Sequence, residues 1–361
     1  MRITKTHIFF DTLLLFMLVM SSGSVFFQLE RNDLSYFLLA LSTFVLIFMG
    51  TMIRRSIFNA SLITLSFTTL LVLLNYILAP DIAVMSSYPR SYLQYGFHLL
   101  NILSCIIILI HFSNNRDYFY FLDRVRFVLR IILYHAIFSF FVYFIVKEFL
   151  FELHGGWEDK YIADTFYYFL FYDPDKYRFS LFGIDLLRNQ GLFWEPGILQ
   201  IYLNLLLFLE GLIFRRSQWI LSLIIFAIIT TYSTTGILIM FVLLVFIYMQ
   251  SIRKNPILII LACSILIPLY FITKTNLEIK TEGERSSSFQ KRYLDLVAPI
   301  AIASDYPLTG LGLDRQYFQR FRSQYNLPYN FGRIIDRTTG LERISQRTDK
   351  GSSNSLTYLM V

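Results

Sequence analysis

The sequence predicts an all-α polytopic membrane protein in which two long polar loops separate groups of membrane-spanning helices. Of the 361 residues, 55% are hydrophobic and only 16% are charged, a composition typical of proteins that span membranes. Apolar runs of about 20 residues, the length that crosses a bilayer as a helix, recur along the chain. Short clusters of Lys and Arg separate these runs, as the positive-inside rule expects of cytoplasmic loops.

Nine spans are predicted. They lie at 8–28, 34–53, 57–78, 93–112, 127–150, 193–213, 219–232, 235–250 and 256–274. The first lacks the small-residue cleavage pattern of a signal peptide and is followed by further spans. Basic clusters set the orientation: Arg2 with Lys5, Arg54 with Arg55, Arg116 with Arg124 and Arg126, Arg215 with Arg216, and Arg253 with Lys254. If all of them face the cytoplasm, the amino terminus is inside and both long loops are outside.

Residues 219–250 allow two interpretations, a single tilted span or a hairpin of two short ones. A break at Tyr232–Gly236 places the basic pairs before and after the segment on the same side, whereas a single span separates them. Each arm of the hairpin is about 22 Å long at 1.5 Å per residue, which is short but tolerable where neighbouring helices cover it. The sequence therefore favours the hairpin.

The predicted organisation has five parts. They are a bundle of five spans at 1–150, an outward loop at 151–192, spans six to nine at 193–274, a second outward loop at 275–354, and the start of a further span at 355–361. The first loop is acidic and the second is basic. Because the last apolar run breaks off after a few residues, we expect a truncated carboxyl terminus.

Charge and cysteine usage exclude several function classes. The net charge of +7 lies largely in the short basic clusters, so it orients the protein and does not indicate nucleic acid. The two cysteines form no Cys-x-x-Cys motif, and no His/Cys cluster has metal-ligand spacing. The sequence therefore predicts no metal site and no cofactor.

The segment 188–197 runs from a polar loop into an apolar helix. Pro196 suits the first helical position, which places a helix amino terminus, attractive to anions, at the predicted outer surface. Arg188 offers a planar fork that matches phosphate oxygens. The alternative is that Arg188 reaches lipid headgroups and Glu195 only caps the helix. The neighbouring aromatic residues Phe193 and Trp194 favour a functional site.

Two further groups of polar residues follow. Arg285 and Arg292 precede a Pro/Gly turn at 307–312, and the alternative is an amphipathic helix on the membrane surface. Residues 352–355 could simply cap the last helix, and 233–236 could simply be a turn. Among ionisable residues within spans, Asp11, Arg130 and Glu210 lie near span ends, where we expect easier solvation. His98 and His135 are more typical of satisfied bundle residues than of catalysts.

Taken in order, these segments resemble the O-antigen polymerase and O-antigen ligase family of membrane glycosyltransferases. That family shows Arg-x-x-Gly-x-Phe followed by Glu-Pro-Gly, a Ser-Thr-Thr-Gly break, an arginine before a helix, a Pro-Leu-x-Gly-x-Gly turn and a Ser/His-Asn-Ser segment. The corresponding residues are Arg188, Gly191, Phe193, Glu195, Pro196, Gly197, Ser233–Gly236, Arg292, Pro307, Leu308, Gly310, Gly312 and Ser353–Ser355. The resemblance covers roughly 185–361, and each motif alone is weak.

The resemblance implies a helical bundle of the glycosyltransferase C type in a bacterial cytoplasmic membrane, with an outward active face. It implies polymerisation of undecaprenyl-pyrophosphate-linked repeat units into O-antigen, capsule or exopolysaccharide. The partners are then the lipid-linked glycan, membrane lipid and a chain-length regulator. Catalytic roles are expected for Arg188, Glu195 and Arg292, without a metal ion. Substrate contacts are expected from Gly191, Trp194, Arg285, Ser353 and Asn354.

One departure bears on the reaction. Ligases of the family commonly carry a histidine, a candidate general base, where this chain has Ser353. This difference favours the polymerase branch and leaves a ligase as the nearest rival. A flippase or other transporter is the rival of another class, but transporters typically show internal repeats and midplane sites. The polar residues of this chain concentrate in its two long loops.

Overall fold

The computed structural model divides into two compact units, which we describe separately. The first comprises Met1–Asn59 and Leu103–Leu266, and the second Ala60–Ile102 and Ile267–Val361. The structure describes residues 5–29, 31–48, 53–79, 91–115, 118–155, 161–174, 178–181, 184–214, 218–254, 299–307, 310–314, 317–318 and 321. The predicted span at 256–274 and the predicted start of a span at 355–361 lie outside them.

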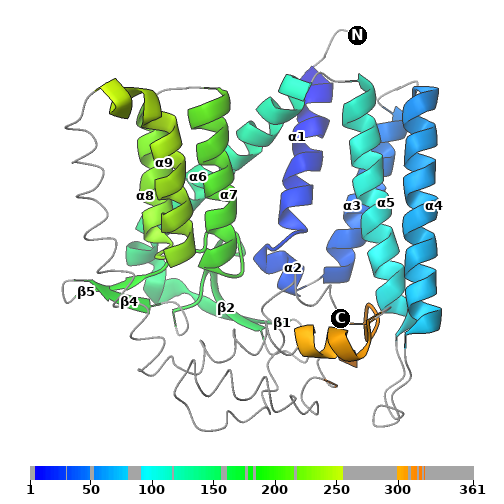
Figure 1. Cartoon of the computed structure of the whole chain (residues 1–361). Helices are drawn as coiled ribbons and strands as arrows, with labels where there is room; N and C mark the ends of the chain where they lie inside the picture. The colour runs from blue at the N-terminus through cyan, green and yellow to red at the C-terminus, as the bar shows by residue number, and fades with distance from the viewer. Residues whose placement is uncertain are drawn as a thin grey trace. The chain divides into compact units, whose positions relative to one another are not determined.

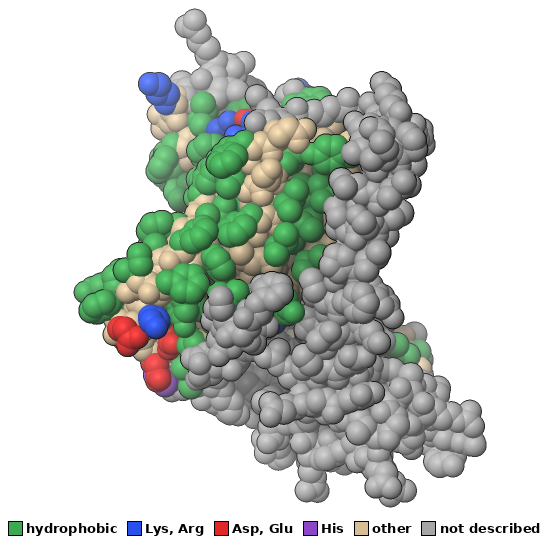
Figure 2. Space-filling model, turned by 90° about the vertical axis from the view of Figure 1, so that its left-hand side faces the viewer, with side chains coloured by type: hydrophobic (Ala, Val, Ile, Leu, Met, Phe, Trp, Pro, Cys, Tyr) green, Lys and Arg blue, Asp and Glu red, His purple; other side chains and the backbone are tan. Residues whose placement is uncertain are grey.

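Helices dominate the described chain, which confirms the predicted fold class (Figure 1). They are α1 (Lys5–Met20), α2 (Val25–Leu29), α3 (Arg31–Phe48), α4 (Arg55–Leu78), α5 (Tyr92–Asn115), α6 (Tyr118–Val146), the 3-10 turn η2 (Lys147–Phe149), α7 (Pro196–Phe208), the π-helical turn η4 (Leu209–Ile213), α8 (Gln218–Thr230) and α9 (Thr234–Lys254). Within the described residues, four helices are long and apolar enough to cross a membrane: Arg55–Leu78, Tyr92–Ser113, Tyr118–Phe149 and Pro196–Ile213. Figure 2 shows hydrophobic side chains over most of the described part of one face.

The first predicted span is not one continuous helix. Helix α1 ends at Met20, and a turn separates it from the short helix α2. The hydroxyls of Ser21 and Ser22 donate to the carbonyls of Leu18 and Val19, so they compete with continued helical bonding. The side chain of Ile198 from α7 would lie 2.9 Å from a Cβ at Gly23, which shows how closely the two segments approach.

Residues 218–254 form two helices, as the hairpin interpretation predicted. Helix α8 ends at Thr230 and α9 begins at Thr234. The reversal places Tyr232 in the left-handed region at φ 48°, a conformation uncommon for a residue with a side chain. The hydroxyl of Thr231 accepts a hydrogen bond from the Ser233 amide at 3.3 Å, which supports the turn from within.

The first long loop contains short antiparallel strands that the sequence did not predict. They are β1 (Phe151–Gly155), β2 (Tyr161–Phe166), β3 (Leu170–Tyr172), β4 (Arg178–Leu181) and β5 (Ile184–Leu187). Among the described residues β1, β2 and β3 form one sheet in that order, and β4 pairs with β5. Residue Phe151 is opposite Thr165, and Asp164 is opposite Tyr172.

The strands pack against the last turns of α6. Leu170, Tyr172 and Leu187 form a buried cluster with Val146 of that helix. The Tyr172 hydroxyl donates to the Ser139 carbonyl oxygen at 2.9 Å, and burial raises the pKa of this phenol to about 12. The sheet therefore has a fixed position on α6, directly before the segment that leads into α7.

Within the described residues, the second unit consists of parts of α4 and α5 and of residues between 299 and 321. Residues 299–305 are helical. A buried cluster joins this segment to the residues that follow it: Ile302, Leu311, Tyr317, Phe318 and Phe321. Leu311, which lies within the predicted Pro/Gly turn at 307–312, is itself part of this cluster.

Candidate active site

The segment 188–197 leaves β5 and enters α7 through a sharp turn. Gly191 adopts φ +55°, a left-handed conformation that glycine reaches without steric cost. A hydrogen bond from its amide to Asn189 Oδ1, at 3.1 Å, closes this turn. After it, Phe193 forms a β-bridge with Ser24, and the Trp194 amide donates to the Gly23 carbonyl at 3.3 Å. The segment is thus tied to the connection between α1 and α2.

Asn189 holds the segment to two other helices. Its side-chain Nδ2 donates to the Ala136 carbonyl of α6 at 3.0 Å and lies 3.1 Å from Thr230 Oγ1 of α8. Its backbone amide donates to the Thr230 carbonyl at 2.9 Å. Asn189 is buried, so each of these bonds is shielded from water. Sequence reasoning missed this residue, although an Asn two positions before a glycine is a turn signal.

Arg188 is oriented by the turn between α8 and α9. Its Nε donates to the Thr231 carbonyl oxygen at 3.0 Å, and the side chain is half-buried. The structure therefore places the Arg188 motif against Thr231, directly before the predicted break at 232–236. A guanidinium that donates through Nε to a neutral carbonyl keeps its formal positive charge, and its planar fork has further donors.

Gln190 contributes a buried polar group to the same segment. Its side chain is 2% exposed, and neither Nε2 nor Oε1 has a hydrogen-bond partner within the described residues. It lines a small cavity with Arg188, Asn189 and Tyr172, and the cavity volume of about 10 Å³ is close to that needed for one water molecule. Because an unpaired buried amide is costly, this position suits a bridging water.

Glu195 and Pro196 form the start of α7 as predicted. Pro196 occupies the first turn, and the Glu195 backbone is extended at φ −148° and ψ 151°. The Glu195 carboxylate makes no capping hydrogen bond to the described first turn, so capping by this side chain is not supported. Its Oε1 lies 3.1 Å from where a Cβ of Gly197 would be. A glycine at 197 therefore gives room to the Glu195 carboxylate beside the helix amino terminus.

The aromatic residues of the segment have different surroundings. Phe193 is fully buried and stacks on Tyr202 of α7, with ring centroids 4.9 Å apart. Trp194 is half-buried. Phe193 thus packs the segment onto α7, whereas the expected substrate contact of Trp194 stays a prediction.

The Ser-Thr-Thr-Gly break is also a close contact between α7 and α9. A Cβ at Gly236 would lie 2.6 Å from Gln200 Oε1 and 2.9 Å from Gln200 Cβ, so a larger residue would force the helices apart. Asn204 Nδ2 donates to the Gly236 carbonyl at 3.1 Å. This motif is more than a turn, because it fixes α9 against the helix that begins at Pro196.

The Pro/Gly turn of the second unit is fixed to α4 and α5. Gly310 and Gly312 adopt φ +57° and +93°. The Leu313 amide lies 3.1 Å from Asn75 Oδ1 and 2.9 Å from the Tyr95 hydroxyl, and His98 Nε2 lies 3.0 Å from the Leu313 carbonyl. His98 is therefore a satisfied bundle residue, as expected.

Asp314 is a buried carboxylate that the sequence did not single out. Its Oδ2 accepts a hydrogen bond from the Ser91 amide at 2.6 Å, and its Oδ1 accepts one from the Tyr317 amide at 3.2 Å. It therefore holds the end of the Pro/Gly turn in the second unit. The expected site residues Arg285, Arg292, Ser353 and Asn354 lie outside the described residues.

The expectation that Asp11, Arg130 and Glu210 are easily solvated is wrong for the two carboxylates. Asp11 and Glu210 are both fully buried. Asp11 lies 2.6 Å from His111 Nε2 of α5 and accepts from the Tyr120 hydroxyl of α6 at 2.7 Å. The side chains that bury these groups come from helices distant in sequence, which span position alone does not reveal.

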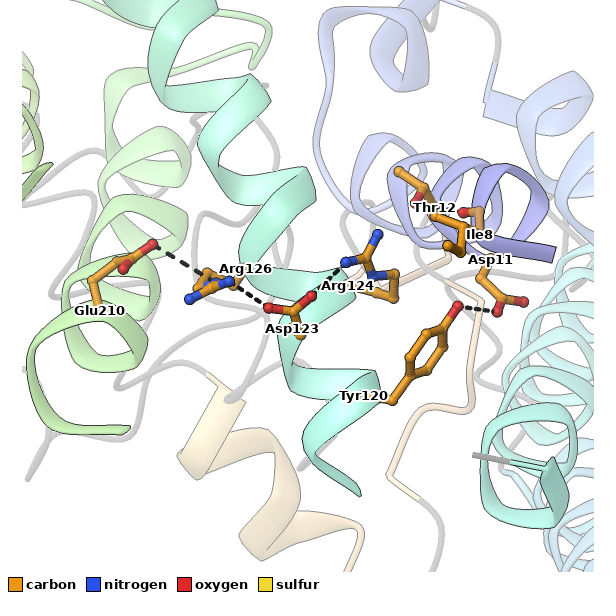
Figure 3. Close-up of polar contacts among 8 residues, drawn as sticks. All are labelled: Ile8, Asp11, Thr12, Tyr120, Asp123, Arg124, Arg126 and Glu210. Carbon is orange, nitrogen blue, oxygen red and sulfur yellow. Dashed lines mark hydrogen bonds and ion pairs between the residues drawn. The ribbon is translucent and has the colours of Figure 1, made fainter. Parts of the chain in front are cut away.

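Glu210 belongs to a cluster of charged residues that we call the Glu210 network: Asp123, Arg124, Arg126, Arg130 and Glu210. Arg130 Nε donates to Glu210 Oε1 at 2.5 Å, and Arg126 Nε lies 4.0 Å from the same oxygen. Figure 3 shows Asp123 between Arg124 and Arg126, with which it forms ion pairs. The π-helical turn η4 carries Glu210, and such turns are frequent at functional sites.

Comparison with known proteins gives one family. The O-antigen ligase family model matches residues 219–338, about a third of the chain. Neither a curated protein nor a solved structure matches this chain. The match begins in α8, includes the break at 231–236 and reaches past the Pro/Gly turn. It confirms the family that the order of the motifs resembled.

Proposed function

We propose that this chain, whose residues 219–338 carry the O-antigen ligase domain, is a polymerase of lipid-linked glycans. It joins undecaprenyl-pyrophosphate-linked oligosaccharide repeat units into O-antigen, capsular polysaccharide or exopolysaccharide at the outer face of a bacterial cytoplasmic membrane. The observation that supports this most is the hydrogen bond between Arg188 and Thr231. It joins the predicted phosphate-binding arginine to the matched domain.

The reaction forms one glycosidic bond and breaks one bond to phosphate. A sugar hydroxyl of the acceptor attacks the anomeric carbon of the donor glycan. The bond from that carbon to the pyrophosphate oxygen breaks, and the lipid pyrophosphate leaves with the electron pair. The hydroxyl proton goes to a base on the enzyme. The catalyst must therefore stabilise a departing anion and accept one proton.

Arg188 and the α7 amino terminus suit the departing anion. Arginine binds phosphate oxygens through two parallel N–H donors, and the Thr231 carbonyl sets the orientation of its guanidinium. The amino terminus of α7, further along the same segment, adds the positive end of the helix dipole. We assign a second contact with the pyrophosphate to Arg292. With two arginines in this role, we propose that no divalent metal ion takes part.

Glu195 is the proposed base. It directly precedes Pro196, and its carboxylate lies beside Gly197 at the start of α7. A carboxylate placed here is on the same segment, 188–197, as Arg188. Ser353 replaces the family histidine that could otherwise accept the proton, and a serine hydroxyl has no useful basicity near neutral pH. This substitution favours polymerisation.

Transfer to a different acceptor is the second candidate, because the matching family is described as O-antigen ligase. Reconstitution in liposomes separates the two. With lipid-linked repeat units as the sole substrate, a polymerase produces a ladder of longer lipid-linked glycans. A ligase leaves these units unchanged until a lipid A core acceptor is added, and that result would refute the polymerase assignment.

A further inference from the structure

A large apolar cavity borders the candidate site within the first unit. Its volume is about 700 Å³, inside the range of about 300–1,000 Å³ typical of ligand sites. Met17 of α1, Leu34 of α3, and Ile131 and Phe138 of α6 contribute to its lining. Leu192, from the segment 188–197, completes one side. The cavity therefore touches the segment that carries Arg188 and Glu195.

A strained turn covers part of this cavity. Tyr167 and Tyr168, between β2 and β3, both adopt left-handed conformations, at φ 49° and 57°. The Phe169 amide donates to the Phe166 carbonyl at 3.1 Å, which closes a β-turn with Tyr167 and Tyr168 at its two central positions. Asn-Gly is the pair that such turns favour, because side chains larger than Asn are strained there. Strain of this kind persists where the surroundings enforce it and often marks a functional site.

Contacts with α6 and β2 hold the turn in place. His135 Nε2 lies 2.9 Å from the Phe169 carbonyl, and the two rings meet edge to face with centroids 5.0 Å apart. Thr165 Oγ1 accepts a hydrogen bond from the Tyr168 amide at 3.1 Å. Tyr168 and Phe169 line the cavity, whereas Tyr167 does not. The aromatic side chains at 168 and 169 are thus retained over an apolar space despite an unfavourable backbone.

The lining indicates what kind of group fits. Tyr134 and Phe138 are about half exposed on α6, a helix that is apolar enough to cross a membrane. Exposed aromatic surface on such a helix suits contact with hydrocarbon. His135 is the one side chain of the lining that could carry charge near neutral pH, and its Nε2 is engaged by Phe169. Sugars and phosphates would find too few polar partners here, whereas a hydrocarbon chain needs none.

We propose that this cavity binds the polyprenyl chain of a lipid-linked substrate, with the turn Tyr167–Phe169 as its roof. The identity of the lipid rests on the proposed function. The polyprenyl chain lies between α1, α3 and α6, and its phosphate end reaches the segment 188–197 past Leu192. Tyr168 and Phe169 press on the chain from the loop side. The strained turn is thereby a determinant of lipid binding.

Two substitutions in the turn form a matched test. Tyr167→Asn and Tyr168→Gly each relieve one left-handed residue, but only Tyr168 lines the cavity. The purified proteins are placed in nanodiscs of phosphatidylethanolamine and phosphatidylglycerol and photolabelled with a tritiated polyprenyl phosphate that carries a diazirine on its chain. We expect Tyr168→Gly to lose about fivefold in labelling, the scale of one aromatic contact. Tyr167→Asn should stay within about twofold of the parent.

Thermal unfolding of both variants tests for a folding defect: relief of the left-handed strain offsets lost side-chain contacts, and a melting temperature close to that of the parent excludes such a defect. A second pair of variants adds a large side chain at two positions of α6. Ile131→Trp occupies the cavity, whereas Ile145→Trp adds the same ring at a position that is exposed and outside the lining. Labelling should fall about tenfold in the first variant, as overpacking predicts, and stay unchanged in the second.

Equal labelling in all four variants would overturn the proposal. So would displacement of the probe by phosphatidylglycerol as effectively as by unlabelled undecaprenyl phosphate, because the cavity would then hold ordinary membrane lipid. Labelling does not depend on polymer synthesis. If the protein is labelled in the cavity but makes no polymer, only the polymerase assignment is contradicted. Polymer synthesis with labelling confined to other peptides contradicts the lipid site alone.

Discussion

The two ends of α7 hold their polar residues in opposite ways. At the Pro196 end, backbone carbonyls orient the side chains: Arg188 donates to Thr231, and Asn189 donates to Ala136. At the Glu210 end, charged side chains pair with one another, and Glu210 accepts from Arg130 at 2.5 Å. In the first arrangement backbone carbonyls set the direction of the side chains, and in the second charged side chains are paired with one another.

This difference separates a candidate site from a structural clamp. A buried ion pair is strongly destabilised when one partner is removed, because the other charge remains without compensation. A side chain held by backbone carbonyls can be replaced at a smaller cost in stability. We therefore expect substitutions at the Pro196 end to reduce activity, and those at the Glu210 end to reduce stability.

The proposed topology places the Pro196 end and the Glu210 end of α7 on opposite sides of the membrane. Cysteine introduced for Glu152, an exposed residue of β1, should react completely with a membrane-impermeant maleimide on intact cells. Cysteine introduced for Arg54, at the start of α4, should react only after the cells are opened. Prior replacement of both native cysteines, Cys105 and Cys263, by serine removes background. Protection of position 152 together with labelling of position 54 would invert the proposed topology.

Arg188→Ala should lower the polymerisation rate by about 10³-fold, the upper range for loss of one donor to a developing anion. Arg188→Lys should restore little, because a lysine is a point charge and cannot reproduce the two parallel donors of the fork. Polymer length and initial rate are measured in liposomes at equal amounts of inserted protein. Long-chain polymer at the normal rate from the alanine variant would remove Arg188 from the site.

Glu210→Ala should destabilise the fold by about 3 kcal/mol, because Arg130 is left without its buried partner. Glu148→Ala is the control: this exposed carboxylate pairs with Lys147, and its loss should change stability by less than about 0.5 kcal/mol. Unfolding by SDS in mixed micelles measures both. A stable but inactive Glu210 variant would assign a functional role to the Glu210 end and would contradict its description as purely structural.

Glu195→Gln should lose about 10²-fold in rate, the usual scale of general-base catalysis, whereas Ser353→Ala should stay near the parent value. The glutamine keeps the shape of the side chain but cannot accept the proton. Single-turnover measurements with saturating acceptor isolate the chemical step. If Glu195→Gln remains active, the base lies elsewhere, even though the family assignment stands.

The sequence predicted the local features of the Pro196 end and missed those that depend on distant partners. Proline at 196 marks the helix start by its own chemistry, and the polar run at 231–236 marks the reversal between α8 and α9. The burial of Asp11 could not be foreseen, because its partner His111 is 100 residues away. The strands at 151–187 were missed for the same reason: they are short, and cross-strand pairing and burial against α6 stabilise them.

The smallest expected effect is that of metal removal, and it concerns the Pro196 end alone. Within the described residues, no three His, Cys, Asp or Glu side chains lie together as metal ligands, and Arg188 offers an organic cation for the leaving group. Excess EDTA should therefore change the initial rate by less than about twofold, since arginine donors do not depend on a divalent ion. The parent protein in metal-free liposomes gives the measurement, with a known magnesium-dependent transferase as a positive control for chelation.

A loss of activity that magnesium or manganese restores would replace the arginine mechanism by metal-assisted departure. Arg188 would then only orient the lipid pyrophosphate, and its alanine variant should show a raised KM with an almost unchanged kcat.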